Sequence, residues 1–304
     1  MATKKSKNKI ILILILVLII AIAIITAVVM LSKQEQSNNK TSAQTTQAVE
    51  TPILSAHFID VGQEDSTLFV SGESAMLIDS GEYEYGDTVI SYLRKLGITE
   101  LDYIVTTHAH SDHMGSMAYV IENIGVNNII MSEPTDSAMS KNFYGDFLDA
   151  VENTDAEIIL AEPDYTFTFG NAECTILSPA EVETDENNNS VVMLITSVSA
   201  SFLMTGDAEK SVEKQLLKDY PDLSATILKA GHHGSKTSSH KEFIETLDAE
   251  TVIISVGKDN SYNHPSEEIL EIYKDNTLDV YRTDLNGSII VDCFKDKYTV
   301  STEK

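Results

Sequence analysis

Hydrophobic residues divide the chain into regions of different character. Between Ile10 and Leu31 the sequence runs for 22 residues without a charge. Residues 32–52 are rich in Ser, Thr, Gln and Asn and contain almost nothing apolar. From Ile53 onward, short apolar runs alternate with amphipathic segments. This division predicts a cytoplasmic basic tail at 1–9, a transmembrane anchor at 10–31, a flexible stalk at 32–52 and one folded domain at 53–304.

The first apolar run is long enough to cross a bilayer. A helix of 22 residues covers about 33 Å, and a hydrocarbon core is about 30 Å thick. Four lysines precede the run and only Lys33 and Lys40 follow it nearby, so the positive-inside rule places the rest of the chain outside the cell. The alternative is a cleavable signal peptide. Such a peptide has a shorter apolar region and a cleavage site of small residues, which Ala27-Val28-Val29 matches poorly. We therefore expect a single-pass signal anchor.

Within the domain, short apolar runs predict strands. Segments of helical period predict helices, three of them closed by Gly97, Gly125 or Pro221 and one preceded by Pro265. The predicted strands are Ser55–Asp60, Ser66–Val70, Ala75–Ile78, Tyr103–Thr106, Asn128–Met131, Glu157–Leu160, Cys174–Leu177, Val191–Ile195, Ser201–Met204, Thr226–Leu228, Thr251–Val256, Asp279–Tyr281 and Ser288–Val291. The predicted helices are Thr88–Leu96, Gly115–Ile124, Asn142–Val151, Glu209–Tyr220 and Ser266–Lys274. This distribution predicts an α+β fold in which helices cover the outer faces of sheets.

Charge narrows the function of this domain. Residues 51–304 carry 15 Lys and Arg against 45 Asp and Glu, a formal charge of −30. A broad nucleic-acid-binding face needs clusters of Lys and Arg, so we expect none. The two cysteines, Cys174 and Cys293, exclude a disulfide framework and a Cys-rich zinc module, and we expect them to be buried as small apolar residues. A metal site must therefore be built from His and carboxylate side chains.

Four potential metal ligands lie within six residues: His108, His110, Asp112 and His113. They follow the apolar run that ends at Thr106. In an extended segment His108 and His110 point to one side, and the other two lie on the turn beyond. Neutral imidazole and carboxylate are good ligands for zinc, manganese and iron. The loop therefore predicts a metal site in preference to a solvated polar loop.

Two later apolar runs end in similar side chains. The run from Ser201 ends at Asp207, which alone would be interpreted as the N-cap of the following helix. Beside the His-rich loop, a metal-binding role that bridges two cations is favoured. The run from Thr226 leads to His232 and His233, which are flanked by glycines. Glycine permits a close approach of the backbone to a ligand.

These loops resemble the metallo-β-lactamase fold superfamily. The resemblance rests on the loop from His108 to His113, Leu77–Gly81, Thr205–Asp207 and Gly231–Gly234. Further segments resemble the extracytoplasmic hydrolase domain of ComEC-type competence proteins, namely His57–Ser66, Lys229–Ser238, Val256–Pro265 and Tyr281–Asp284. The resemblance implies an αββα sandwich of two sheets, with a dinuclear metal centre at one edge that activates water.

Carried over residue by residue, the resemblance implies two divalent cations, zinc or manganese. It assigns His108 and His110 to the first cation, Asp112, His113 and one of His232 and His233 to the second, and Asp207 as a bridge between them. Asp79 would orient a ligand. Asp112 or Asp207 would accept the proton of the attacking water.

The sequence departs from the family pattern at two places. The usual third His of the first cation is missing, and the equivalent stretch is Asn187–Ser190. ComEC-type relatives have a similar Asn-rich segment there, so we expect a first site that binds weakly or favours manganese. Glu64 stands where relatives usually have glycine, and we expect it to narrow access to the site.

Four other residues are candidates for contact with substrate. His264 either contacts a phosphoryl oxygen or protonates the leaving group, or it is merely the residue before a proline that begins a helix. Lys229, Lys236 and Arg282 either bind an anionic substrate or are ordinary surface charges.

The resemblance implies an extracellular phosphodiesterase that acts on nucleic acid. At a charge of −30 a DNA substrate would need a local basic groove or bridging by divalent cations. The alternatives are a hydrolase of choline-phosphate or other cell-envelope esters, and a metal-depleted binding module. A β-lactamase is not expected, because the third His is missing.

Overall fold

The computed structural model describes residues 20–33 and 50–304. The chain divides at residue 50 into two units, which we consider separately. Residues 20–33 are helical. No helix in the described part of the chain has both the length and the apolar character that a membrane crossing requires. The predicted tail lies outside the described residues, and so do part of the predicted anchor and most of the predicted stalk.

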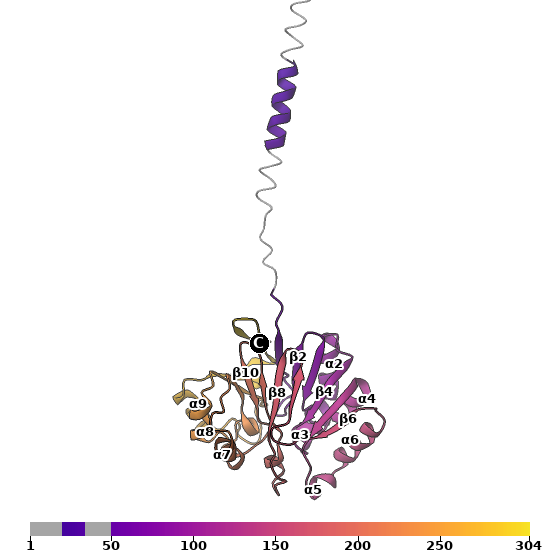
Figure 1. The fold of residues 1–304 in the computed structure, drawn as a ribbon, viewed down its shortest axis with the longest axis vertical. Coiled ribbons are helices and arrows are strands. Elements are labelled where there is room, and N and C mark those ends of the chain that lie inside the picture. The colour runs from indigo at the N-terminus through magenta and orange to yellow at the C-terminus, as the bar shows by residue number, and fades with distance from the viewer. Residues whose placement is uncertain (1–19, 34–49) are drawn as a thin grey trace, which may run out of the picture. The chain divides into compact units, whose positions relative to one another are not determined.

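Residues 51–304 fold into two β-sheets that lie between two layers of helices (Figure 1). Sheet A has the order β15-β14-β1-β2-β3-β4-β5-β6, with β1 (Leu54–Phe58), β2 (Thr67–Ser71), β3 (Ser74–Ile78), β4 (Glu100–Thr106), β5 (Gly125–Met131), β6 (Glu157–Leu160), β14 (Ile289–Cys293) and β15 (Tyr298–Thr302). Sheet B has the order β13-β12-β11-β10-β9-β8-β7, with β7 (Thr166–Phe169), β8 (Ala172–Ser178), β9 (Val192–Thr196), β10 (Ser201–Met204), β11 (Ile227–Lys229), β12 (Thr251–Ile254) and β13 (Asp279–Arg282). The expected αββα sandwich is confirmed.

Helices cover the outer face of each sheet (Figure 1). Sheet A is covered by α2 (Gly86–Lys95), α4 (Met117–Asn123) and α6 (Asn142–Glu152). Sheet B is covered by α7 (Lys210–Asp219), α8 (Lys241–Leu247) and α9 (Glu267–Asp275). The shorter helices are α3 (Ser111–Met114), α5 (Asp136–Met139), α10 (Thr283–Asn286), η1 (Tyr83–Tyr85), η2 (Glu186–Asn189) and η3 (Gly231–Gly234).

The apolar side chains form a layer between the sheets and a further layer under each set of helices. In the central layer, the rings of Phe69 from β2 and Phe202 from β10 meet edge to face, with centroids 5.3 Å apart. Strands that are buried on both faces have continuous apolar sequences. That property explains why most of them could be found as apolar runs.

All predicted strands and helices are present, with ends that differ by a few residues. Strands β7 and β15, helix α8 and the short helices α3, α5, α10 and η1 to η3 were not predicted. Cys174 and Cys293 are buried, as expected, and both are free thiols. Strands β3 to β6 run parallel in sheet A, and β10 to β13 run parallel in sheet B. Loops at the carboxyl ends of such strands are the usual position of functional side chains in α/β sheets.

Candidate metal centre

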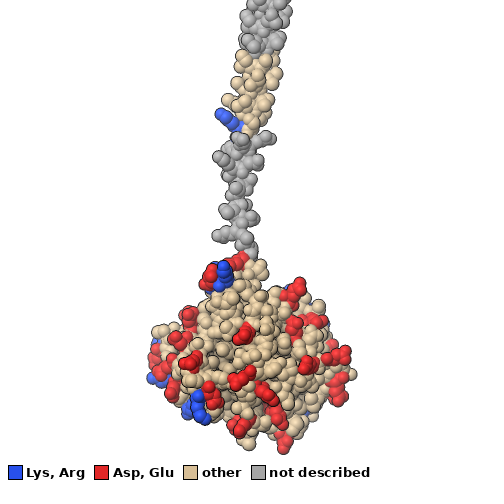
Figure 2. Space-filling model, viewed as in Figure 1, with Lys and Arg blue, Asp and Glu red and all other residues tan. Residues whose placement is uncertain are grey.

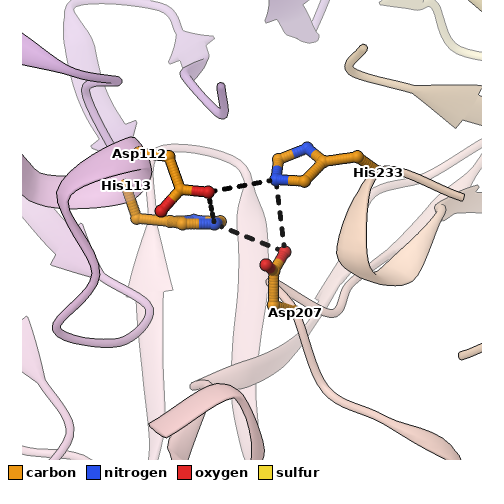
Figure 3. A group of neighbouring side chains, drawn as sticks. All are labelled: Asp112, His113, Asp207 and His233. Carbon is orange, nitrogen blue, oxygen red and sulfur yellow. Dashed lines mark ion pairs between the residues drawn. The ribbon is translucent and has the colours of Figure 1, made fainter. Parts of the chain in front are cut away.

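Four side chains from both halves of the domain converge on one point (Figure 3). Asp112 and His113 lie on α3 after β4, Asp207 follows β10, and His233 lies in η3 after β11. The Oδ1 atom of Asp207 is 3.3 Å from His113 Nε2 and 3.7 Å from His233 Nε2. The Oδ2 atom of Asp112 is 3.6 Å from His233 Nε2. One ligand atom from each residue lies within 4.8 Å of the others.

Several of these ligand atoms lack any other partner. His113 Nε2, His233 Nε2 and Asp207 Oδ1 are buried and accept or donate no hydrogen bond within the described residues. Buried polar atoms are ordinarily paired, so three such atoms that face one another need a common partner. Two imidazoles and two carboxylates form a donor set that suits zinc or manganese. The residues present therefore fit a divalent cation.

The second nitrogen of each imidazole is held by the protein. Asp79 Oδ2 lies 2.8 Å from His113 Nδ1, and the Asp79 carboxylate also accepts hydrogen bonds from the backbone N–H and the hydroxyl of Thr107. His233 Nδ1 lies 3.1 Å from the carbonyl oxygen of Ser255. These contacts orient both Nε2 atoms toward Asp207, as the outer contacts of metal-binding histidines usually do.

Asp65 lies close to the Nδ1 atoms of the same two imidazoles and is not among the site residues expected from the sequence. It is buried, and its carboxylate lies 3.6 Å from His233 Nδ1 and 4.0 Å from His113 Nδ1. Its other contact is an ion pair of 2.9 Å with the buried Lys229. The signal that could have found this pair is the lysine itself, because a lysine inside an apolar strand requires a carboxylate partner.

The backbone at Asp207 depends on the preceding glycine. Gly206 has a φ of +50°, and an added Cβ would lie 2.9 Å from both the Ser190 hydroxyl and Thr107 Cβ. The same hydroxyl accepts a hydrogen bond of 3.0 Å from the backbone N–H of Asp207. Any side chain at residue 206 would therefore displace the aspartate that faces both imidazoles.

When no cation is bound, the carboxylate of Asp207 and the two imidazoles of the centre shift one another's pKa values in opposite directions. Burial raises the pKa of Asp207, but His113 and His233 outweigh burial and hold that pKa well below its usual range. Burial lowers the pKa of His113, but Asp207, Asp79 and Asp112 raise it well above its usual value. Despite burial, Asp207 and Asp65 likewise raise the pKa of His233.

Cation binding is therefore expected to release protons, because a metal binds only the neutral imidazole nitrogen. We expect about one to two protons released per cation near neutral pH, and an apparent affinity that rises with pH until both imidazoles are neutral. Calorimetric titration of the full chain with Zn²⁺ in buffers of different ionisation enthalpy measures the proton count. A count near zero would contradict the raised pKa values of His113 and His233.

His108 and His110 lie beside the four converging residues but bond to each other. His108 Nε2 is 3.0 Å from His110 Nδ1, and His108 Nδ1 is 3.3 Å from the Ser190 hydroxyl. The ring of His108 packs against that of His113, with centroids 4.1 Å apart. The converging group found among the described residues does not include these two histidines, so the first cation site stays a prediction.

The segment that stands in place of the third His has a structural use. Asn188 Oδ1 accepts hydrogen bonds from the backbone N–H of Glu209 and the hydroxyl of Ser211, at the start of α7. Asn189 bonds both the backbone N–H and the carbonyl of Glu183. The N-cap residue of α7 is Glu209, so Asp207 does not cap this helix. The position of Asp207 favours its role in the metal centre.

The two adjacent histidines occupy different positions. His233 belongs to the converging group and is buried. His232 is partly exposed, and its Nε2 lies 3.7 Å from the other oxygen of Asp207, while its Nδ1 lies 3.1 Å from the Thr237 hydroxyl. The geometry therefore favours His233 as the ligand beside Asp112 and leaves His232 at the open side of Asp207.

His264 lies next to the centre, with its ring 5.7 Å from that of His232. Burial and the neighbouring His232 and His233 lower the pKa of His264 to about 4. The side chain is therefore neutral at neutral pH. The neutral ring can donate a hydrogen bond from its N–H group, but it lacks the additional proton that a general acid gives to a leaving group.

The expected role of Lys229 in substrate binding is wrong. Lys229 is 1% exposed, and its ammonium group is neutralised by Asp65, so it meets no substrate. The guanidinium of Arg282 is similarly occupied by a bidentate contact with Asp284, at 3.0 Å and 2.6 Å. Lys236 is exposed near the loop of His232 and remains a candidate.

Glu64 adds a further acidic group beside the centre. One of its oxygens is buried without a partner, and burial together with Asp112 raises the pKa of Glu64 to about 8. The narrowing of access by this side chain stays a prediction.

Known proteins of similar sequence and fold indicate the family of this chain. The chain is 33% identical over 256 residues to ComE operon protein 3 of Bacillus subtilis, covering 76% of this chain and 32% of that protein. It is 28% identical to competence protein ComA of Neisseria gonorrhoeae, covering 76% of this chain and 31% of that one. It thus spans about a third of the length of these relatives. The metallo-beta-lactamase fold protein YhfI from Bacillus subtilis superposes with a TM-score of 0.50 at 14% identity, covering 75% of this chain and 95% of YhfI.

The resemblance to ComEC-type competence proteins is thereby confirmed, and the likeness to YhfI concerns the fold alone. Residues 59–257, which include all four converging ligands, match the Metallo-beta-lactamase superfamily as a family. The chain therefore belongs to the metallo-β-lactamase superfamily.

Proposed function

We propose that the domain is a metal-dependent phosphodiesterase that cleaves short or single-stranded nucleic acid outside the cell. The proposal rests on one observation. His113 Nε2, His233 Nε2 and Asp207 Oδ1 converge, and none of these atoms has a hydrogen-bond partner within the described residues. A divalent cation held by these residues would supply Lewis acidity and would lower the pKa of a water molecule toward about 7. A second cation at His108 and His110 is part of this proposal, and metal content tests it.

The carboxylates of the centre differ in what they can reach. The side chain of Asp112 is 34% exposed, whereas that of Asp207 is 2% exposed. A proton acceptor must contact the attacking water, so we assign that role to Asp112 and assign Asp207 to holding the cation. His264 would donate its N–H to a phosphoryl oxygen.

Charge favours a small substrate. The visible face of the domain carries many acidic side chains with few Lys and Arg between them (Figure 2). Together with a charge of −30 on residues 51–304, this surface repels a long polyanion, so we expect attraction to come from the cation and from a few local side chains.

The location outside the cell rests on the sequence of the N-terminal segment. Residues 10–31 carry no charge and follow four lysines, which supports a signal anchor with the domain outside. Protease added to intact cells is then expected to remove the domain. Protection of the domain until the cells are lysed would contradict this placement.

The proposal is tested by turnover of several esters by the full chain with Mn²⁺ or Zn²⁺. We expect cleavage of bis(4-nitrophenyl) phosphate and of short single-stranded DNA, slower cleavage of long duplex DNA, and loss of activity with a chelator. Cleavage of 4-nitrophenyl phosphorylcholine alone would support the cell-envelope ester alternative. If no ester is cleaved, the metal-depleted binding module is the alternative that remains. Stoichiometric metal uptake would then distinguish such a module from a protein that has no metal site.

A further inference from the structure

A pocket beside the metal centre has the shape and lining of a nucleotide site. We propose that it binds the nucleotide next to the scissile phosphodiester, with that nucleotide's phosphate on Lys141 and its base on Phe143. The inference rests on the phosphodiesterase activity proposed above and specifies which substrates it accepts.

The position of the pocket connects it to the chemistry. It has a volume of about 730 Å³, and its lining includes His110 and Asp112 from the His-rich loop. The opposite walls come from the start of α6 and from residues 184–186. Small-molecule sites typically measure about 300–1,000 Å³. A molecule in this pocket therefore lies directly beside the carboxylate that we assign as proton acceptor.

The lining contains one lysine, Lys141, and three carboxylates, those of Asp112, Asp185 and Glu186. Glu186 accepts hydrogen bonds from the backbone N–H of Ala109 at 3.2 Å and of Thr135 at 3.0 Å, one on each oxygen. Asp185 caps η2 by accepting from the backbone N–H of Asn187. Lys141 is exposed and has no carboxylate within ion-pair distance in the described part of the chain.

The engaged carboxylate also fixes the shape of the pocket. Because Glu186 joins the His-rich loop to the loop before α5, it sets the width between two walls. Lys141 precedes the first turn of α6, an 11-residue helix that begins without a side-chain cap. Free N–H groups at a helix start add to the attraction for a phosphate near Lys141.

The aromatic wall defines the rest of the ligand. Phe143 is half-buried, and with Ala109 and Ala138 it contributes apolar surface to the lining of the pocket. Nucleic-acid bases stack on such rings with little regard to sequence. A base inside a pocket cannot be paired in a duplex, so the site would select single strands and frayed ends over intact duplexes.

The test compares two substrates that differ in their second phosphate. The full chain is assayed with a 5′-phosphorylated thymidine dinucleotide and with bis(4-nitrophenyl) phosphate, which has no second phosphate. For Lys141→Ala we expect the ratio of the KM values, dinucleotide over bis(4-nitrophenyl) phosphate, to rise about tenfold, as loss of one charge-assisted contact predicts. Lys274→Ala, which removes an exposed lysine of α9, is the matched control and should leave the ratio unchanged. Phe143→Leu should raise KM for both substrates.

Direct binding separates failure of the pocket from failure of the activity. Thymidine 5′-monophosphate is titrated calorimetrically into the same three proteins: wild type, Lys141→Ala and Lys274→Ala. If Lys141→Ala weakens nucleotide binding about tenfold and Lys274→Ala does not, the pocket assignment is supported. This conclusion holds even if the wild type cleaves neither substrate. In that case only the phosphodiesterase proposal fails. If the wild type cleaves both substrates but the KM ratio and the binding are the same in the lysine variants, the pocket assignment is overturned and the phosphodiesterase stands. Absence of nucleotide binding also overturns it.

Discussion

Asp207→Asn is expected to lower kcat for bis(4-nitrophenyl) phosphate by about a thousandfold or more. Asp207 Oδ1 is the atom that faces both His113 Nε2 and His233 Nε2, so an amide there removes the negative charge that a cation needs between two neutral imidazoles. Metal-ion catalysis contributes several kcal/mol to transition-state stabilisation, and each 1.36 kcal/mol is about tenfold in rate.

Metal content measured on the same proteins gives the cause. We expect Asp207→Asn to retain much less Zn²⁺ or Mn²⁺ after gel filtration than the wild type. Asp275→Asn, which changes an exposed aspartate at the end of α9, is the matched control and should retain both metal and activity. Full activity in Asp207→Asn would remove the basis of the proposed metal centre.

Lys229→Met is expected to destabilise the domain by about 3–5 kcal/mol, which would make it one of the most damaging single changes in the chain. The substitution leaves the buried carboxylate of Asp65 without its cation, and breaking a buried pair by removing one partner costs about that much. Urea unfolding in the presence of a chelator measures the change in the free energy of unfolding without a contribution from bound metal.

Two further variants separate the loss of the pair from the loss of the side chain. Lys236→Met, at an exposed lysine nearby, is expected to change the free energy of unfolding by no more than about 0.5 kcal/mol. The double variant Asp65→Leu/Lys229→Met removes both charges and should recover most of the stability. A double variant as unstable as Lys229→Met would show that methionine packs badly there and that the ion pair is not the cause.

Much of the fold could be predicted because its strands are apolar on both faces. The elements missed are those whose sequences lack that property. In β7, Thr166 and Thr168 alternate with phenylalanines, and in β15 the half-exposed edge strand has no apolar run. Helix α8 is short and is followed by Asp248, without the glycine or proline that closes most of the predicted helices.

The site could be predicted where its chemistry is local and not where it depends on distant partners. His113 and Asp112 were found because four ligand types crowd one short loop. The pairing of Asp65 with Lys229 could not be read in the same way, because it joins a turn of sheet A to a strand of sheet B. The choice between His232 and His233 depends on backbone torsions in η3, where both residues have positive φ, and residue order does not encode these.

The strand order of sheet A has a consequence for how the protein is made. The first strand, β1, lies between β2 and β14, and Leu54 pairs with Cys293 near the other end of the chain. During synthesis one edge of β1 has no partner until residues 289–293 have left the ribosome. Unpaired edges attract other chains and slow folding, since contacts so distant in sequence form late. Sheet A therefore closes only after residues 289–293 have been synthesised, and until then one edge of β1 stays open to pairing with other chains.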